Sequence, residues 1–201
     1  MRSGVLVILL LATVFVFGFA WTFLETPRAF VLKDGIFQFS SLNVFSQNSM
    51  ILGMGNFSEI GIVDSSFLEQ IQVLKKPFDL SVGMRVGFDE NSSFFLAVGE
   101  KTRAFEFSSA ISYDTPRSSE TSITFYALAG VPTQIGNVRL EYKKSSRSNL
   151  LAVGIVANFS ANEKVRWLFR SLSVGVGMGW DFNNVENFYP SNTYFVFQYT
   201  R

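Results

Sequence analysis

The sequence predicts an all-β fold in which one antiparallel sheet closes into a barrel, and three observations lead to this prediction. Apolar and small residues alternate with a period of two along most of the chain, as side chains do on the two faces of a strand. Turn-forming residues, chiefly Gly, Ser, Asn, Asp and Pro, interrupt these runs at short intervals. Beyond residue 30 no helical period is sustained for long. Many short strands with short connections are typical of a sandwich or a barrel.

Four stretches show the alternation most clearly. In SLSVGVGMGWDF, residues 171–182, one face carries Leu, Val, Met, Trp and Phe, whereas the other carries only Ser, Gly and Asp. The stretches 79–88, 104–113 and 138–143 repeat this pattern. Weaker runs begin at Gly35, Met50, Phe57, Phe67, Ser93, Thr121, Leu150 and Thr193. Together they make about twelve candidate strands, with ends uncertain by a few residues.

One segment, residues 162–170, departs from the strand pattern. Val165 and Leu168 have helical spacing, and Asn162 is suited to cap a helix N-terminus. We expect a short amphipathic helix that packs at the mouth of the barrel or inside it. The alternative is a strand with a bulge that switches faces near Arg170.

The composition fits a single folded domain and excludes several kinds of function. The chain has 201 residues, of which 48% are hydrophobic and 16% charged. Its formal net charge is +1 and its basic residues are scattered, so no nucleic-acid partner is expected. It contains no Cys and no His, which removes disulfides, Cys/His metal sites and Ser/His/Asp triads. We therefore expect no enzymatic activity, no cofactor and no metal ion.

The N-terminus has the features of a secretory signal peptide. Arg2 precedes a long apolar run, and Gly18 and Ala20 supply the small residues that signal peptidase reads. Cleavage after Ala20 would remove residues 1–20 and leave one β-barrel domain, residues 21–201. The alternative is an uncleaved anchor, because the same uncharged run is long enough to span a bilayer as a helix.

The chemistry of the second face indicates which way the strands point. It is dominated by Gly, Ser, Ala and Asn, whereas a water-facing sheet would carry more Lys, Glu and Thr. Small residues suit a narrow interior, so we expect the apolar face to point outward to lipid. The scattered charges on the small face are then candidates for lining the lumen, where they would set selectivity or form a polar plug; otherwise some would lie in water at strand ends. These candidates are Arg85, Glu106, Arg139 and Glu141.

The C-terminal stretch NTYFVFQYTR resembles the closing strand of bacterial outer-membrane β-barrel proteins. Phe195, Phe197 and Tyr199 alternate along it, although Arg201 stands where that class normally has an aromatic residue. Together with the signal peptide and the strand-rich body, the resemblance implies a place in the outer membrane, in contact with its lipid. Barrel enzymes of that class, such as lipases, lipid A modifying enzymes and omptin-type proteases, typically depend on a histidine, which this chain lacks.

The length limits the kind of barrel. A membrane-spanning strand takes about nine to eleven residues, so general porins are too large for this chain. An up-and-down transmembrane barrel of about 8–12 strands fits. We expect a structural or narrow-channel, porin-like role in the cell outer membrane. The alternative is a secreted or periplasmic barrel or sandwich that binds an apolar ligand or polymer, with the same apolar residues turned inward. Nothing in the sequence indicates an oligomeric state.

Overall fold

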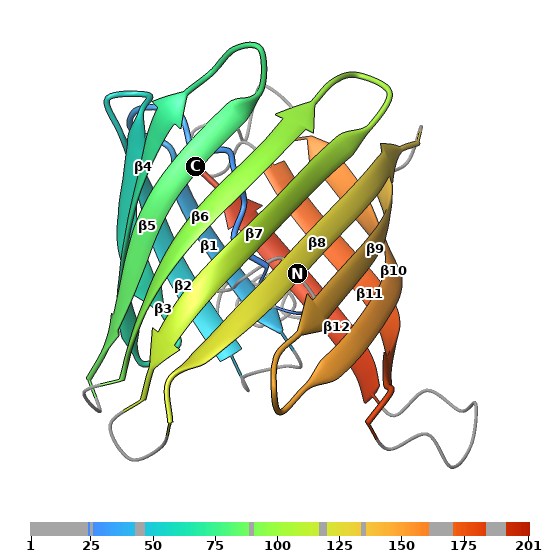
Figure 1. The fold of residues 1–201 in the computed structure, drawn as a ribbon. Coiled ribbons are helices and arrows are strands. Elements are labelled where there is room, and N and C mark those ends of the chain that lie inside the picture. The colour runs from blue at the N-terminus through green and yellow to red at the C-terminus, as the bar shows by residue number, and fades with distance from the viewer. Residues whose placement is uncertain are drawn as a thin grey trace, which may run out of the picture.

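The computed structural model is a closed barrel of twelve antiparallel strands (Figure 1). The strands are β1 (Phe37–Leu42), β2 (Gln47–Met54), β3 (Ser58–Val63), β4 (Ser66–Leu74), β5 (Asp79–Gly87), β6 (Ser92–Lys101), β7 (Glu106–Thr115), β8 (Ser122–Pro132), β9 (Gly136–Lys144), β10 (Asn149–Ser160), β11 (Ser171–Asp181) and β12 (Asn192–Thr200). The structure describes residue 24 and residues 26–42, 47–88, 91–116, 120–133, 136–160, 171–183 and 192–201.

Every strand pairs with its neighbours along the chain, and β1 pairs with β12 to close the sheet. At this seam the Phe37 N–H donates to the Arg201 carbonyl at 3.1 Å, and the Arg201 N–H donates to the Phe37 carbonyl at 2.9 Å. Closure gives every described strand a hydrogen-bonded neighbour on both sides. The prediction of an all-β, antiparallel up-and-down barrel is confirmed, with twelve strands at the upper limit of the expected range.

The two ends of the barrel are called upper and lower, as drawn in Figure 1. Odd-numbered strands run from the upper end to the lower, and even-numbered strands run back. The turns at 55–57, 75–78 and 102–105 therefore lie at the upper end, together with Arg201. The turns at 64–65 and 145–148 lie at the lower end.

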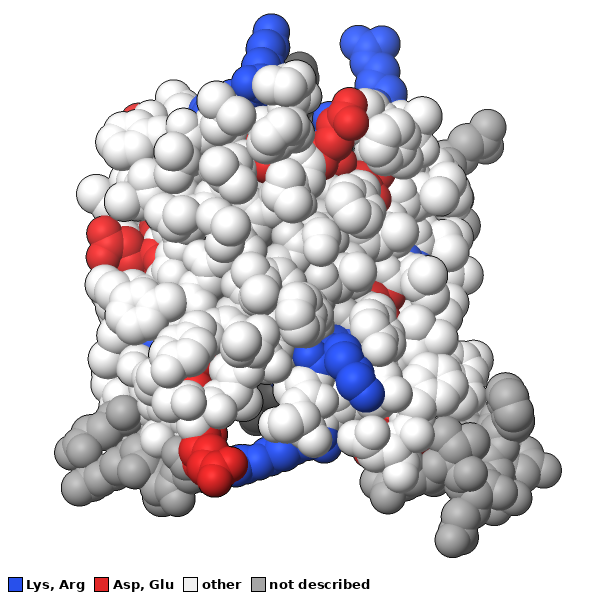
Figure 2. All heavy atoms as spheres, viewed as in Figure 1, with Lys and Arg blue, Asp and Glu red and all other residues white. Residues whose placement is uncertain are grey.

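The apolar face of the strands points away from the barrel interior. In β5, Val82 is 41% exposed, whereas the adjacent Ser81 is fully buried at 0%. In β11, Val176 is exposed and Ser173 is buried. Figure 2 shows the result on one side of the molecule, where uncharged side chains cover most of the wall and charged ones gather mainly toward the two ends.

Exposed aromatic side chains lie near both ends of the wall. Those toward the upper end are Phe57, Phe78, Phe105, Phe107 and Phe159. Those toward the lower end are Phe67, Phe88, Phe94, Tyr113, Phe125, Phe182 and Phe195. Exposed aliphatic residues lie between the two groups, among them Leu96, Ile111, Leu140, Ile155 and Val176.

Two predictions concern residues outside the described ranges. The signal peptide and its boundary at residues 1–20 are not described, and neither is the short helix near 162–170. In the part of the chain that the structure describes, no helix is long and apolar enough to cross a membrane.

Candidate functional site

The lumen is the candidate site, because it is where polar side chains are buried. Burying a polar group costs free energy unless it is hydrogen bonded. The hydrogen-bond partners of these groups therefore show which part of the lumen is filled and which part is open. The buried polar residues on the strands include Gln38, Ser49, Glu59, Gln70, Ser81, Glu106, Ser108, Ser112, Thr124, Arg139, Glu141 and Ser173.

A segment that precedes β1 lies inside the barrel, and we call Leu24 and residues 26–32 the lumenal segment. Leu24, Thr26 and Ala29 are 5%, 3% and 0% exposed. Figure 1 shows this part of the chain as a blue trace that passes within the wall before β1 begins. The chain therefore fills part of its own lumen.

Two buried carboxylates on opposite walls hold the two ends of the lumenal segment. On β9, Glu141 Oε2 accepts hydrogen bonds from the Leu24 N–H at 3.0 Å and the Thr26 hydroxyl at 3.2 Å. On β3, Glu59 Oε2 accepts one from the Leu32 N–H at 2.8 Å. Because β3 and β9 are six strands apart in either direction around the closed sheet, the segment crosses the lumen from wall to wall.

Small and amide side chains hold the middle of the segment. The Ser81 hydroxyl donates to the Ala29 carbonyl at 2.6 Å, and Ser108 Oγ accepts from the Ala29 N–H at 3.1 Å. Gln70 Nε2 donates to the Arg28 carbonyl at 2.7 Å. A Cβ at Gly99 would lie only 3.1 Å from the Ala29 Cβ, so the backbone of the segment passes close to the wall. Small residues on the inner face of the strands thus make room for the chain itself.

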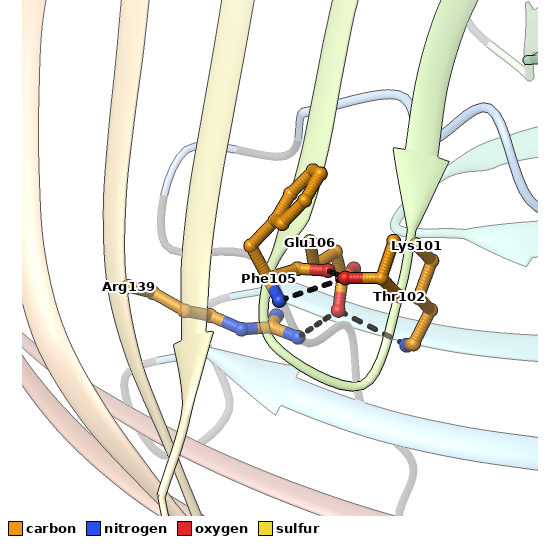
Figure 3. A network of polar contacts seen from close by, with 5 residues as sticks. All are labelled: Lys101, Thr102, Phe105, Glu106 and Arg139. Carbon is orange, nitrogen blue, oxygen red and sulfur yellow. Dashed lines mark hydrogen bonds and ion pairs between the residues drawn. The ribbon is translucent and has the colours of Figure 1, made fainter.

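Beside the turn at 102–105, Glu106, Arg139 and Lys101 form a cluster of charged side chains (Figure 3). Glu106 Oε2 is 3.4 Å from Arg139 Nη2 and 3.0 Å from Lys101 Nζ. Arg139 is 1% exposed, whereas the Lys101 side chain is 53% exposed. Gly130 of β8 stands in register between Glu106 and Arg139, so no side chain separates the pair. The cluster neutralises a guanidinium that is completely enclosed, which a buried charge requires.

The sequence-predicted lumen residues fall into two groups. Glu106, Arg139 and Glu141 are buried on the inner side of β7 and β9, and the first two form an ion pair while the third binds the lumenal segment. Arg85 on β5 is set apart from them toward the lower end. Its guanidinium carbon is 6.0 Å from the centre of the Phe95 ring.

A polar cavity of about 390 Å³ opens at the lower end of the lumen, and we call it the lower cavity. Its charged lining residues are Arg85, Asp114, Lys143 and Arg147, and the others are mainly serine, threonine and asparagine. Asp114 accepts hydrogen bonds from the hydroxyls of Ser112 at 3.0 Å and Thr124 at 2.7 Å. Figure 2 shows a hollow at this end with charged side chains at its margin.

Sequence reasoning missed the lumenal segment and three of the four charged cavity residues, namely Asp114, Lys143 and Arg147. Lys143 shares a face with Arg139 and Glu141 in the alternating stretch 138–143, so parity was a usable signal for it. Arg147 lies in the turn that follows β9, where no periodicity exists to orient a side chain. The lumenal segment has no alternation and follows directly on the apolar N-terminal run, so nothing in its sequence marks a place inside a barrel.

Comparison with known proteins and a search for metal-binding clusters add no assignment. No family model matches the chain, and no curated protein matches it. Within the described ranges, no group of three or more His, Cys, Asp or Glu side chains is arranged to hold a metal ion.

Proposed function

We propose that this protein is a small barrel of a bacterial outer membrane, with a structural or narrow-channel role and no catalytic activity. One observation carries the proposal: exposed side chains along the wall are apolar while the polar and charged ones are buried inside. Each square ångström of apolar surface left in water costs about 25 cal/mol. A continuous apolar wall is therefore favourable in lipid and unfavourable in water.

The distribution of exposed aromatic residues supports a membrane location. Aromatic side chains at both rims, with aliphatic residues between them, match the girdles of outer-membrane barrels, which lie at the two lipid–water interfaces. Here the rings are mostly Phe, so their contribution is mainly the burial of apolar area.

Strand length also agrees with a membrane location over most of the wall. The strands β4 to β12 have 9 to 12 residues, and crossing a bilayer takes about nine to eleven. The strands β1, β2 and β3 have 6, 8 and 6 residues. Of these, β1 and β2 border residues 43–46, which lie outside the described ranges, so only β3 is a complete short strand.

A secreted or periplasmic binding barrel is the weaker alternative. Such a barrel would turn its apolar residues inward around a core or an apolar pocket, whereas Val82, Leu96 and Val176 point outward. The lower cavity is lined mainly by polar and charged residues, which does not suit an apolar ligand.

The proposed membrane location is tested by comparing unboiled and boiled samples of purified outer-membrane fractions on a denaturing gel. We expect a band whose mobility shifts only after boiling, because a closed barrel resists detergent at room temperature. A protein found in the soluble fraction, with no shift on boiling, would contradict the proposal.

The role is tested by conductance across a planar bilayer. The lumenal segment crosses the lumen, so we expect the full chain to give small current steps or none. A variant lacking residues 24–32 should give larger steps, since those residues would be replaced by water. Replacing the same residues with a Gly/Ser sequence of equal length is the matched control for chain length. Equal conductance of the full chain and the deletion would rule out the segment as the element that narrows the lumen.

A further inference from the structure

The lower cavity is a second feature of the lumen that the proposed function does not use. It lies at the end of the barrel opposite to the turns at 75–78 and 102–105, and its volume is about 390 Å³. Pockets for small molecules are typically about 300 to 1,000 Å³. The lower cavity therefore has room for a ligand of the size of a monosaccharide derivative.

Among the residues that the structure describes, the lining of the cavity has more positive than negative side chains. Arg85, Lys143 and Arg147 give three positive charges, and Asp114 gives one negative charge, so the lining residues sum to +2. The Asp114 carboxylate is already engaged by two hydroxyls, those of Ser112 and Thr124. A concave site with one dominant sign of charge and walls of low dielectric concentrates ions of the opposite sign.

The cations are positioned by neighbouring parts of the wall. Lys143 pairs in register with Tyr126 on β8, and its Nζ is 5.6 Å from the centre of that ring. Arg147 belongs to a turn in which Ser145 Oγ accepts hydrogen bonds from the backbone N–H groups of Arg147, at 3.1 Å, and Ser148, at 3.0 Å. The aromatic contact restrains the Lys143 side chain, and the hydrogen-bonded turn fixes the backbone from which the Arg147 side chain extends.

Several residues with hydroxyl groups line the same cavity as the cations. They belong to Ser92, Ser93, Ser122, Thr124, Ser145 and Ser148. A hydroxyl both donates and accepts hydrogen bonds, which suits the hydroxyl groups of a sugar. The guanidinium groups of arginine match phosphate and carboxylate oxygens with paired donors.

We propose that the lower cavity binds a hydroxylated small-molecule anion. Its phosphate or carboxylate group is held by Arg85, Lys143 and Arg147, and its hydroxyl groups are held by the serine and threonine side chains of the lining. This inference goes beyond the proposed function and does not require it, because the cavity is formed by the barrel whether or not the wall faces lipid.

The test is isothermal titration calorimetry on the full chain, folded in lauryldimethylamine oxide micelles, which contain neither sugar nor phosphate. The probes are glucose 6-phosphate, glucuronate and glucose, at low ionic strength so that screening is weak. We expect at least one of the two anions to bind about tenfold or more tightly than glucose, and the stronger one identifies the anionic group. Equal binding of glucose and the anions, or no binding of any probe at millimolar concentration, would overturn the proposal.

Adjacent lysines on opposite faces of β9 provide matched variants. Lys143→Gln should weaken binding of the preferred anion by about tenfold, since it removes a cation from the lining. Lys144→Gln removes the same charge from the outer face and should leave the affinity unchanged. An equal loss in both variants would mean non-specific charge attraction and would overturn the assignment.

A third variant guards against misfolding. Arg147→Gln alters an exposed turn rather than a strand, so the barrel should form normally and keep its boiling-dependent gel shift. We expect the affinity for the same anion to fall several-fold. An unchanged affinity in a correctly folded Arg147→Gln protein, together with an unchanged affinity in Lys143→Gln, would remove the site.

Discussion

Arg139 and Leu140 are neighbours on β9, yet they occupy opposite environments. Arg139 is 1% exposed and pairs with Glu106 inside the barrel, whereas Leu140 is 46% exposed on the outer face. The same contrast recurs on β11, where Ser173 is buried and Val174 is exposed. A soluble barrel has the reverse arrangement. The period-two pattern therefore separates side chains between an apolar outer face and a lumen that is lined largely by the protein's own polar groups.

The contrast explains why small residues dominate the inner face. The lumenal segment needs space for its backbone and partners for its N–H and carbonyl groups, and serine supplies both at Ser81 and Ser108. The outer face has neither requirement and is filled with large apolar side chains. Substitutions that are harmless on one face should be damaging on the other.

The largest effect is expected for removal of the buried charge partner. Glu106→Leu removes the carboxylate that pairs with the enclosed Arg139 at 3.4 Å, and we expect the free energy of unfolding in lipid vesicles to fall by about 3–5 kcal/mol. Lys101→Met removes the exposed partner of the same carboxylate and should cost less than about 1 kcal/mol. Guanidinium titration of the two variants measures both values. Equal losses would mean that burial of Arg139 does not determine the strength of this cluster.

A charge placed on the outer face tests the other half of the contrast. Leu140→Arg places an arginine on the outer face, next in sequence to the inward-facing Arg139. We expect it to lower the free energy of unfolding by about 2–4 kcal/mol in vesicles. Lys144 lies on the same face at the end of β9, so Lys144→Leu should change stability by less than about 1 kcal/mol. A neutral or stabilising Leu140→Arg variant would show that this wall faces water.

A smaller effect is expected at the anchor of the lumenal segment. Glu141→Gln replaces a charged acceptor for the Leu24 N–H and the Thr26 hydroxyl with a neutral one, at a cost of about 1–2 kcal/mol. Amide hydrogen exchange at Leu24, followed by NMR, should accelerate. Glu59→Gln is the control, because it should accelerate exchange at Leu32 on the opposite wall instead. Faster exchange at Leu32 in Glu141→Gln, or at Leu24 in Glu59→Gln, would contradict the described path of the segment.

The smallest effect, and a gain, is expected at Glu69, which departs from the apolar pattern of the outer face. It shares a face of β4 with the exposed Phe67 and Ile71. We expect Glu69→Leu to stabilise the barrel in vesicles by about 1 kcal/mol, since a carboxylate in hydrocarbon is unfavourable. Gln70→Leu, on the inner face, should instead destabilise it by removing the hydrogen bond to Arg28. A loss of stability in Glu69→Leu would indicate a polar partner for this carboxylate.

The barrel was predictable from sequence because alternation and turn residues are local signals. The stretches 79–88 and 171–182 correspond closely to β5 and β11, and their small residues do occupy the buried face. The pairing of β1 with β12 was harder to predict. It joins residues far apart in the chain, and the alternating aromatics of the terminal stretch were the only indication of a closing strand.

The site was predictable only in part, for a physical reason. Parity marks Arg139 and Glu141 as sharing the small face, but it does not say what fills the space in front of them. The lumenal segment is held by contacts between irregular backbone and side chains on several strands. Such contacts depend on the closed shape of the wall and leave no periodic trace in the segment's own sequence.

The seam between β1 and β12 sets the order in which the molecule can be completed. The lumenal segment leads into β1 through residues 33–36, so it must be inside the curved sheet before the seam forms or pass through one end afterwards. Closing the seam joins Phe37 to Arg201, so it closes a loop that contains every residue between them. The conformational entropy lost in closing so long a loop slows this step. Folding should therefore be slow, and formation of the seam should be a late step.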